Sequence, residues 1–153
     1  MSLFYKYLHN KTHQESPKHQ KYCVKSADGV VIVKLVNKNT GDVIATNVQT
    51  AYSFWRRFRG LMLKENMPEG SALHIAPCPS IHTFFMKFSI DILYLNKENE
   101  IVGVEKELAP GKIGKRFAGG YSVIEFPTGG ICDLAVHIGD TLDFVDEGWE
   151  YGS

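Results

Sequence analysis

The sequence predicts one mainly β domain of the β-rich α+β class, with a compact antiparallel or mixed sheet that could close into a barrel. Short apolar runs rich in β-branched residues are separated by Gly, Pro, Asn and Asp, which favour tight turns. Strands and helices do not alternate along the chain, and this disfavours a parallel doubly wound sheet. The chain has 153 residues, 44% of them hydrophobic. It can therefore bury roughly two-thirds of its extended surface, which suffices for one core.

The first predicted element is a hairpin. Residues 30–36 and 43–48 are apolar and β-branched, and Asn39-Thr40-Gly41-Asp42 lies between them. Asn and Gly tolerate the positive φ that a tight reversal requires. A polar turn between two such runs therefore predicts paired antiparallel strands.

A prominent helix is predicted over about 50–63. The apolar residues there recur at helical spacing and cover one stripe of the helix surface; they are Ala51, Phe54, Trp55, Phe58, Leu61 and Met62. Arg57 and Arg59 fall on the two shoulders of that stripe. We therefore expect both arginines to lie along the domain surface with partly buried stems.

Further strands are predicted over residues 71–76, 82–88, 90–95, 101–107, 122–126 and 141–145, with turn residues between them. Alternation places His82, Phe84, Met86 and Phe88 on one face of the 82–88 strand, and its two largely apolar faces indicate a central strand. A short helix is predicted over about 128–136, where Thr128 offers a cap before a small apolar set.

The N-terminal segment differs in charge from the rest of the chain. Of the 17 Lys and Arg residues, five lie in residues 1–25, which leaves twelve; of the 17 Asp and Glu residues only Glu15 lies there, which leaves sixteen. We predict a flexible basic arm over 1–21, a single β-rich domain over 22–147 and a tail over 148–153. A mildly acidic body makes nucleic-acid binding unlikely, because such affinity comes from clustered cations that neutralise phosphates.

Cysteine usage and hydropathy indicate the compartment. Three widely spaced cysteines without a C-x-x-C pair predict reduced thiols, with neither a disulfide framework nor a zinc site. We see no secretory apolar region and no eighteen-residue apolar span, so we expect a soluble, cytoplasmic protein without a membrane span. Met62, Met86, His82 and Cys78 could suit copper. Methionines beside aromatic residues usually fill cores, however, so we expect no metal and no cofactor.

An ordered series of short motifs resembles a known family. The motifs are Arg57-Phe58-Arg59-Gly60-Leu61-Met62, Pro68-Glu69-Gly70, residues 82–87, Ile90-Asp91-Ile92, Pro110-Gly111, residues 125–130 and Gly139-Asp140. Together they resemble the prokaryotic family catalogued as domain of unknown function 192, over about residues 43–145. The chain departs from the commonest pattern, Met-Lys-Asn-Thr, by reading Met86-Lys87-Phe88-Ser89. The resemblance implies a small, mostly β domain with one prominent helix and no established activity.

Lys87 is the first candidate for function, because a charge inside an apolar run needs a partner. One interpretation is a structural ion pair of Lys87 with Asp91 or Glu125. The other is that Lys87, Arg57 and Arg59 form a patch that receives an anion, with His82 beside it. The Gly-rich loop of residues 110–120 lacks the order of a phosphate-binding loop, so it reads as a mobile loop that could cover the patch.

A catalytic interpretation uses His82 as a general base, with Asp91 or Glu125 as the acid and Cys78 or Ser80 as the nucleophile. Such groups must meet in space, which a sequence does not show. We therefore prefer a ligand- or partner-binding accessory module, whose partner would be a small anion or a protein, and we lean away from an enzyme. A small hydrolase that uses His82 as base is the alternative.

Overall fold

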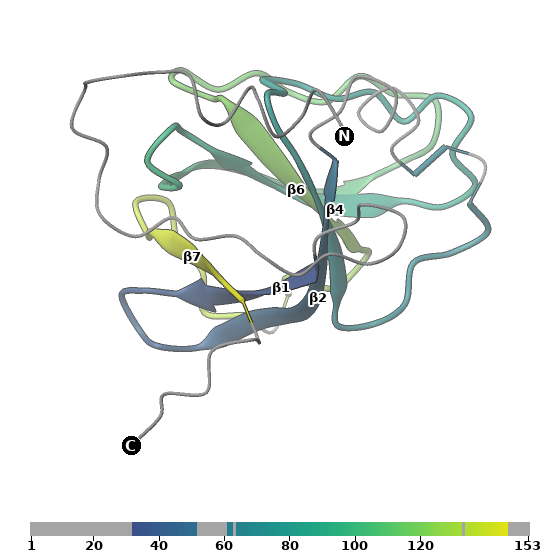
Figure 1. The fold of residues 1–153 in the computed structure, drawn as a ribbon. Helices are drawn as coiled ribbons and strands as arrows, with labels where there is room; N and C mark the ends of the chain where they lie inside the picture. Colours follow the sequence, from purple (N-terminus) through teal and green to yellow (C-terminus); the bar gives the residue numbers. More distant parts are fainter. Residues whose placement is uncertain (1–31, 52–60, 63, 133, 147–153) are drawn as a thin grey trace, which may run out of the picture.

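A computed structural model of the chain describes residues 32–51, 61–62, 64–132 and 134–146. In this part of the chain the fold consists of seven strands and the turns that join them (Figure 1). The strands are β1 (Ile32–Asn37), β2 (Val43–Ala51), β3 (Ser71–Ile75), β4 (Ile90–Leu95), β5 (Ile101–Leu108), β6 (Ser122–Pro127) and β7 (Leu142–Val145). The mainly β prediction is confirmed.

All seven strands belong to one mixed sheet with the order β5-β4-β6-β3-β2-β1-β7. Neighbouring strands are antiparallel except β2 and β3, which run parallel with Ala51 beside Ile75. Strands β4 and β6 lie next to each other and are the most deeply buried part of the sheet. They have twelve residues, and the ten other than Ser122 and Pro127 are all buried and either apolar or acidic. This pair therefore forms the centre from which side chains reach both faces.

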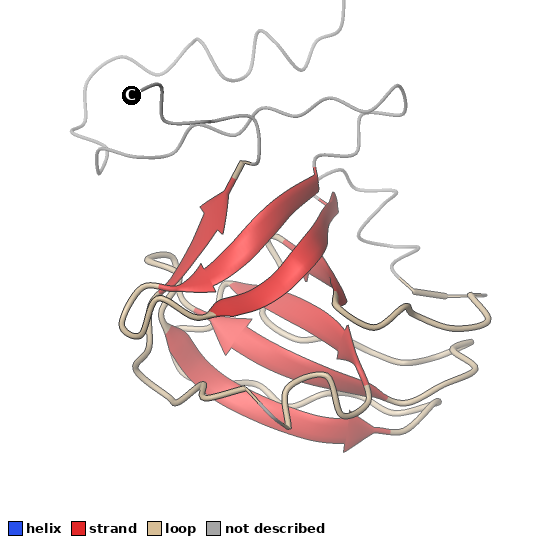
Figure 2. Ribbon diagram, turned by 90° about the horizontal axis from the view of Figure 1, so that it is seen from below, coloured by secondary structure: helices blue, strands red, loops and turns tan. Residues whose placement is uncertain are grey.

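The sheet bends strongly but does not close into a barrel, so the barrel-like form that the sequence suggested is wrong. Figure 2 shows the bend, with strands at the top and bottom of the view turned toward a common interior. The edge strands β5 and β7 meet at one end only, through a bridge between Glu100 and Thr141. Two backbone hydrogen bonds support that bridge, from Ile101 N–H to the Asp140 carbonyl (2.8 Å) and from Leu142 N–H to the Asn99 carbonyl (2.9 Å).

An inner core fills the concave side of the bend. It joins the β7-β1-β2 half of the sheet to the β4-β6 half, and its members come from all seven strands and the turn after β6: Val33, Leu35, Ile44, Ala45, Val48, Ala72, Leu93, Leu95, Ile101, Ile124, Phe126, Ile131, Leu142 and Phe144. Burying this much apolar surface is the main favourable term for the fold.

An outer core lies on the opposite face of the central strands. It includes Ile90, Ile92 and Tyr94 of β4, and the segments before β4 cover it with Ile81 and Met86. Along β4 the residues alternate between the two cores, as the period of two requires. Both faces of the central strands are therefore apolar, which explains their nearly unbroken hydrophobic sequence.

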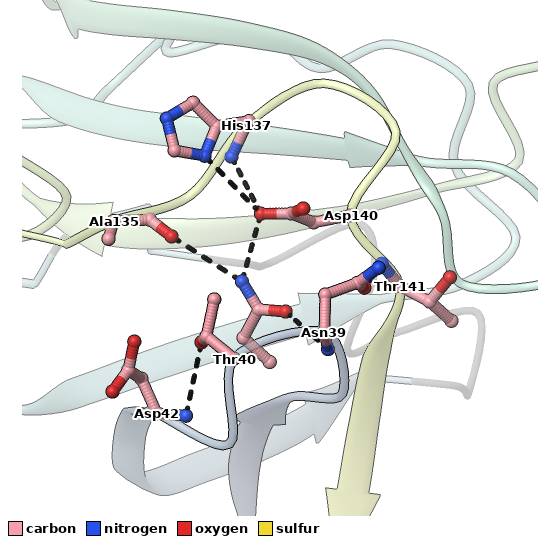
Figure 3. A network of polar contacts seen from close by, with 8 residues as sticks. Asn39, Thr40, Asp42, Ala135, His137, Asp140 and Thr141 are labelled. Atoms are coloured by element: carbon pink, nitrogen blue, oxygen red, sulfur yellow. Dashed lines mark hydrogen bonds and ion pairs between the residues drawn. The ribbon is translucent and has the colours of Figure 1, made fainter.

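A polar network fastens the first hairpin to the loop before β7. The Asn37 side-chain amide, which is fully buried, donates to Asp140 Oδ2 (2.9 Å), and that oxygen also accepts the His137 backbone N–H (2.9 Å). Figure 3 shows Asp140 turned toward His137 on one side and toward the hairpin on the other, with Asn39 beside Thr141. Asn39 Oδ1 accepts the Thr141 N–H (2.8 Å). These contacts hold the β1-β2 turn against β7.

The helix predictions are not supported. Strand β2 continues through Ala51, so the predicted start of the first helix at residue 50 is wrong, and residues 61–62 form a turn. Residues 52–60 and 63 lie outside the described part of the chain. Where a helix was expected over 128–136, successive turns occupy the described residues; Gly129 has a φ of 83°, which a right-handed helix does not allow.

The strand predicted over 82–88 is also wrong. His82 makes one isolated bridge, with Ile113, and the rest of the segment is turns and irregular backbone. Phe85 has a φ of 63°, the left-handed region, which a strand does not contain. An apolar run therefore marks a buried strand at 90–95 but an exposed turn at 82–88.

Candidate functional site

A rigid loop pair is the most distinctive surface of the described structure. The segments 81–89 and 109–116 are tied together at Thr83, which is fully buried. The Thr83 hydroxyl donates to the Ala109 carbonyl (2.6 Å) and accepts the Lys112 N–H (2.9 Å). The backbone of Thr83 adds two further bonds, from its N–H to the Lys112 carbonyl (2.8 Å) and from the Gly111 N–H to its carbonyl (2.9 Å). A single threonine thus satisfies backbone groups of both segments.

Three large apolar side chains project from this loop pair. Phe84 is 40% exposed, and Phe85 and Ile113 are each 72% exposed. We call these three residues the aromatic ledge. The His82 ring stacks on Phe84, with ring centroids 5.0 Å apart, so an exposed histidine forms one side of the ledge.

Phe85 holds its exposed position at a conformational cost. A left-handed φ is uncommon for any residue with a side chain and is an outlier for a bulky one. Such strain costs roughly 1–3 kcal/mol and persists where the surrounding structure enforces it. Here the Met86 N–H bonds to the Thr83 carbonyl (3.2 Å) and closes the turn around Phe85. The Phe85 ring is therefore exposed to solvent at a cost in the stability of the fold.

The two loop segments are also cationic. They contain Lys87, Lys112, Lys115 and Arg116, all exposed, and no acidic residue. We call these four residues the basic rim. Lys87 forms an ion pair with Glu65, not with Asp91 or Glu125, so the partner predicted for Lys87 was wrong. Because both side chains of this pair are at least half exposed, it contributes little to stability.

Asp91 lies in the interior, away from the loop pair, and its hydrogen bonds hold the backbone together. It is fully buried on β4. Its Oδ1 accepts the Glu107 N–H (2.9 Å), and its Oδ2 accepts the N–H groups of Gly129 (2.9 Å) and Ile131 (3.5 Å). The carboxylate thus ties the end of β5 to the turn after β6.

Glu125 occupies the opposite face of the sheet from Asp91. It is 3% exposed, and it lies between Leu73 of β3 and Ile92 of β4, both members of the outer core. Burial raises the pKa of the Glu125 carboxyl to about 8, and the charge of Lys64 opposes this rise. Within the described residues, Oε2 of Glu125 has no hydrogen-bond partner. A neutral carboxylic acid at neutral pH is the consequence.

The Tyr94 hydroxyl lies on the same face of the sheet as Glu125, near the loop pair. Tyr94 donates its hydroxyl hydrogen to Glu105 Oε2 (2.8 Å), and burial together with this bond raises the pKa of the Tyr94 phenol. A Cβ at Gly114 would lie 2.6 Å from the Tyr94 hydroxyl oxygen. Gly114 therefore lets the 109–116 segment pack directly against Tyr94.

The predicted site residues thus divide into separate places. His82 and Lys87 belong to one loop segment, while Asp91 and Glu125 project from opposite faces of the sheet. Arg57 and Arg59 lie outside the described residues. Sequence reasoning missed Ile113, whose only signal was an isolated apolar residue between lysines in a Gly-rich loop. The described residues contain no group of three His, Cys, Asp or Glu side chains that could hold a metal ion.

Comparison with known proteins places this fold in a family. The model of the DUF192 family, described as "Uncharacterized ACR", matches residues 35–144. The chain belongs to the DUF192 family. The match begins at Leu35, half-way along β1, and ends at Phe144 in β7, so it includes strands β2 to β6 in full.

This DUF192 protein is similar to UPF0127 proteins of Thermococcus and Pyrococcus. It is 37% identical over 115 residues to a UPF0127 protein of Thermococcus sibiricus, covering 72% of this chain and 73% of that one. It is 32% identical over 117 residues to a UPF0127 protein of Pyrococcus furiosus, covering 72% of this chain and 97% of that one. Neither name states an activity.

Solved structures show the same fold. A Novosphingobium aromaticivorans protein of unknown function superposes with a TM-score of 0.65 at 13% identity, covering 87% of this chain and 99% of that one. A Sinorhizobium meliloti protein, named as a candidate transcription regulator, superposes with a TM-score of 0.63 at 19% identity, covering 73% and 91%. At these identities the likeness concerns the fold alone.

Proposed function

We propose that this DUF192 protein is a docking module that uses the aromatic ledge to contact a partner and the basic rim to attract negative charge on that partner. The observation that carries the proposal is the exposed Phe85 ring, held in a strained backbone conformation beside two other exposed apolar side chains. Strain retained by a fold supports a functional role for the residue that bears it. Clustered exposed apolar groups are typical of interaction sites.

The rigidity of the loop pair supports the same proposal. A loop whose backbone groups are already bonded loses little conformational entropy when a partner binds. Thr83 supplies that preorganisation through the bonds to Ala109, Gly111 and Lys112. The predicted contribution of Arg57 and Arg59 to an anion-receiving patch stays a prediction on sequence grounds.

The hydrolase alternative has less support. A catalytic His82 would need an orienting acid, and the Asp91 carboxylate already accepts three backbone N–H groups in the interior. Glu125 is buried in the outer core, and His82 is stacked on Phe84 at the surface. A turnover assay of His82→Ala against a panel of esters and phosphoesters tests this alternative, and abolished hydrolysis would favour it.

Site-specific photo-crosslinking tests the docking proposal. A photoreactive phenylalanine replaces Phe85 in one sample and Ile138 in the other; Ile138 is matched because it is 68% exposed but lies in the loop before β7. In extracts of the protein's own cells, membranes included, we expect a discrete protein or lipid adduct from position 85 and none from position 138. Identical adduct patterns from the two positions would contradict the proposal.

A further inference from the structure

We infer that the partner of the aromatic ledge is the surface of a lipid bilayer that carries anionic headgroups. This inference rests on the docking function proposed above and names the partner. It treats the loop pair as a peripheral membrane anchor, with the apolar tips of Phe85 and Ile113 entering the boundary between headgroups and acyl chains while the basic rim stays among the headgroups.

The first argument is the shape of the apolar surface. Phe85 and Ile113 are each 72% exposed, so both side chains project into solvent instead of lining a recess. A partner that receives projecting side chains must yield around them. The interface of a bilayer does so, and aromatic and aliphatic tips are what interfacial anchors place there.

The second argument is charge. Within segments 81–89 and 109–116 the exposed charged side chains are Lys87, Lys112, Lys115 and Arg116, without an acidic residue among them. Lys87 shares its charge with Glu65, and the other three cations are free to face headgroups in the sense that no ion pair involves them among the described residues. Anionic lipids attract each such cation by roughly a fivefold gain in partitioning.

The third argument is the hydrogen bonding of the backbone beside Ile113. Polar backbone groups that leave water without a partner oppose insertion, since the boundary offers few hydrogen bonds. In the loop pair the Ala109 carbonyl, the Gly111 N–H and both backbone groups of Lys112 are bonded to Thr83. These groups precede Ile113 in the chain, so insertion of the Ile113 side chain breaks no hydrogen bond between them and water.

Among the described residues, no helix is long and apolar enough to cross a bilayer. An acidic peptide is the competing partner, since it too would suit the basic rim. The peptide has less support because a strand or helix of a partner binds best against a groove or a sheet edge, whereas this ledge projects from a closed loop pair.

Vesicle co-sedimentation of the full chain tests the inference. The probes are vesicles of phosphatidylcholine alone, vesicles of phosphatidylcholine mixed with phosphatidylglycerol, and soluble polyglutamate as the acidic-peptide arm. We expect the protein to pellet with the anionic vesicles only, and less so in high salt because salt screens the basic rim. Phe85→Ser should weaken partitioning roughly tenfold through lost apolar contact, and the double variant Lys112→Gln/Lys115→Gln roughly twentyfold.

Matched controls separate the ledge from general surface effects. Ile138→Ser removes an equally exposed apolar side chain, and Lys38→Gln removes an exposed lysine of the first hairpin turn; both should pellet like the wild type. Thermal unfolding confirms that every variant is folded. If folded Phe85→Ser pellets like the wild type, the ledge is not the anchor and the inference is overturned.

Two outcomes distinguish this inference from the docking function itself. Binding to polyglutamate without binding to anionic vesicles, together with a protein adduct from position 85, overturns the membrane partner and leaves the docking function in place. Absence of binding to vesicles and polyglutamate, together with identical adducts from positions 85 and 138, overturns both.

Discussion

Asp91 and Glu125 come from adjacent strands of the sheet and project from its opposite faces. Ile92 pairs with Glu125 and Asp91 pairs with Phe126, so the two acids are one residue out of step across the β4-β6 ladder. The consequence is two buried carboxyl groups with opposite physical behaviour. Asp91 is held by three backbone N–H donors, and Glu125 lies in an apolar environment without a described partner for Oε2.

Asp91→Ala should destabilise the protein by about 3 kcal/mol, because it leaves the backbone N–H groups of Glu107, Gly129 and the buried Ile131 without this acceptor. Asp91→Asn retains one acceptor oxygen and should lose less, about 1–2 kcal/mol. Urea unfolding followed by tryptophan fluorescence measures both values. Equal stability of Asp91→Ala and the wild type would show that the carboxylate does not tie β5 to the turn after β6.

Glu125 should make stability fall as pH rises. Its folded pKa of about 8 exceeds the ordinary value of 4.5, so the folded protein binds this proton more tightly than the unfolded chain does. The contribution is complete below pH 4.5, declines as pH rises from there to about 8, and is constant above that. At pH 7 the difference from low pH is about 3 kcal/mol for this group alone.

Glu125→Gln isolates that effect, because glutamine has the same shape and does not ionise. Its stability relative to the wild type should rise steadily between pH 5 and pH 8, measured by urea unfolding at each pH so that other titrating groups cancel in the difference. Parallel stability curves for the two proteins would mean that Glu125 titrates normally.

Phe85→Asn should raise stability and weaken docking at the same time. Asparagine tolerates a left-handed φ far better than phenylalanine does, so about 1 kcal/mol should be gained. The exposed ring contributes little burial that could be lost. Thermal unfolding measures the gain, and vesicle co-sedimentation measures the loss of binding.

Phe84→Asn is the matched control for this comparison. Phe84 is not among the described residues with positive φ, and its ring stacks on His82. The substitution should therefore lower stability. A gain at both positions would point to a general benefit of removing exposed rings and would contradict the strain at Phe85.

Gly103→Ala should destabilise the outer core by roughly 2 kcal/mol through overpacking. A Cβ at residue 103 would lie 2.4 Å from Cγ of Phe117, which is too close for any real contact. Phe117→Ala in the same chain removes the clash, so the double variant should be more stable than the sum of the single effects predicts. Additive effects in this double-mutant cycle would show that the backbone moves aside instead.

The strands were largely predictable from sequence, and their order was not. Alternating apolar residues between turn residues are local signals, and they placed the seven strands, from the hairpin of β1 and β2 to β7, within a few residues. Strand β3 lies between β2 and β6, although β4 and β5 separate β3 from β6 along the chain. Such pairings depend on distant contacts that periodicity does not encode.

The errors have a physical cause as well. Phe84, Phe85 and Met86 form an apolar run of the kind that predicts a buried strand, but the two phenylalanines are exposed and the methionine alone belongs to the outer core. Hydropathy alone does not distinguish an apolar run that is exposed at the surface from one that is buried in a core. Likewise, the partner of Lys87 depends on where Glu65 lies in space.

The candidate site was predictable in part. His82 and Lys87 were identified because they are polar side chains within an apolar run, and both lie on the loop pair that carries the ledge. Glu125 was predicted as a partner of Lys87 or as an acid for His82, but it lies buried between β3 and β4, away from the ledge. Ile113 and the anchoring role of Thr83 emerged only when the two segments were brought together by the fold.

The pairing of β1 with β7 places the first and last strands of the described chain side by side in the sheet, since Lys34 lies opposite Val145. A chain linked across that point and reopened at the Asn96 to Glu100 turn would keep every strand beside its present neighbours. The domain is accordingly suited to circular permutation, and equally to being grafted whole into a surface loop of a host protein, where both connections would leave from one edge.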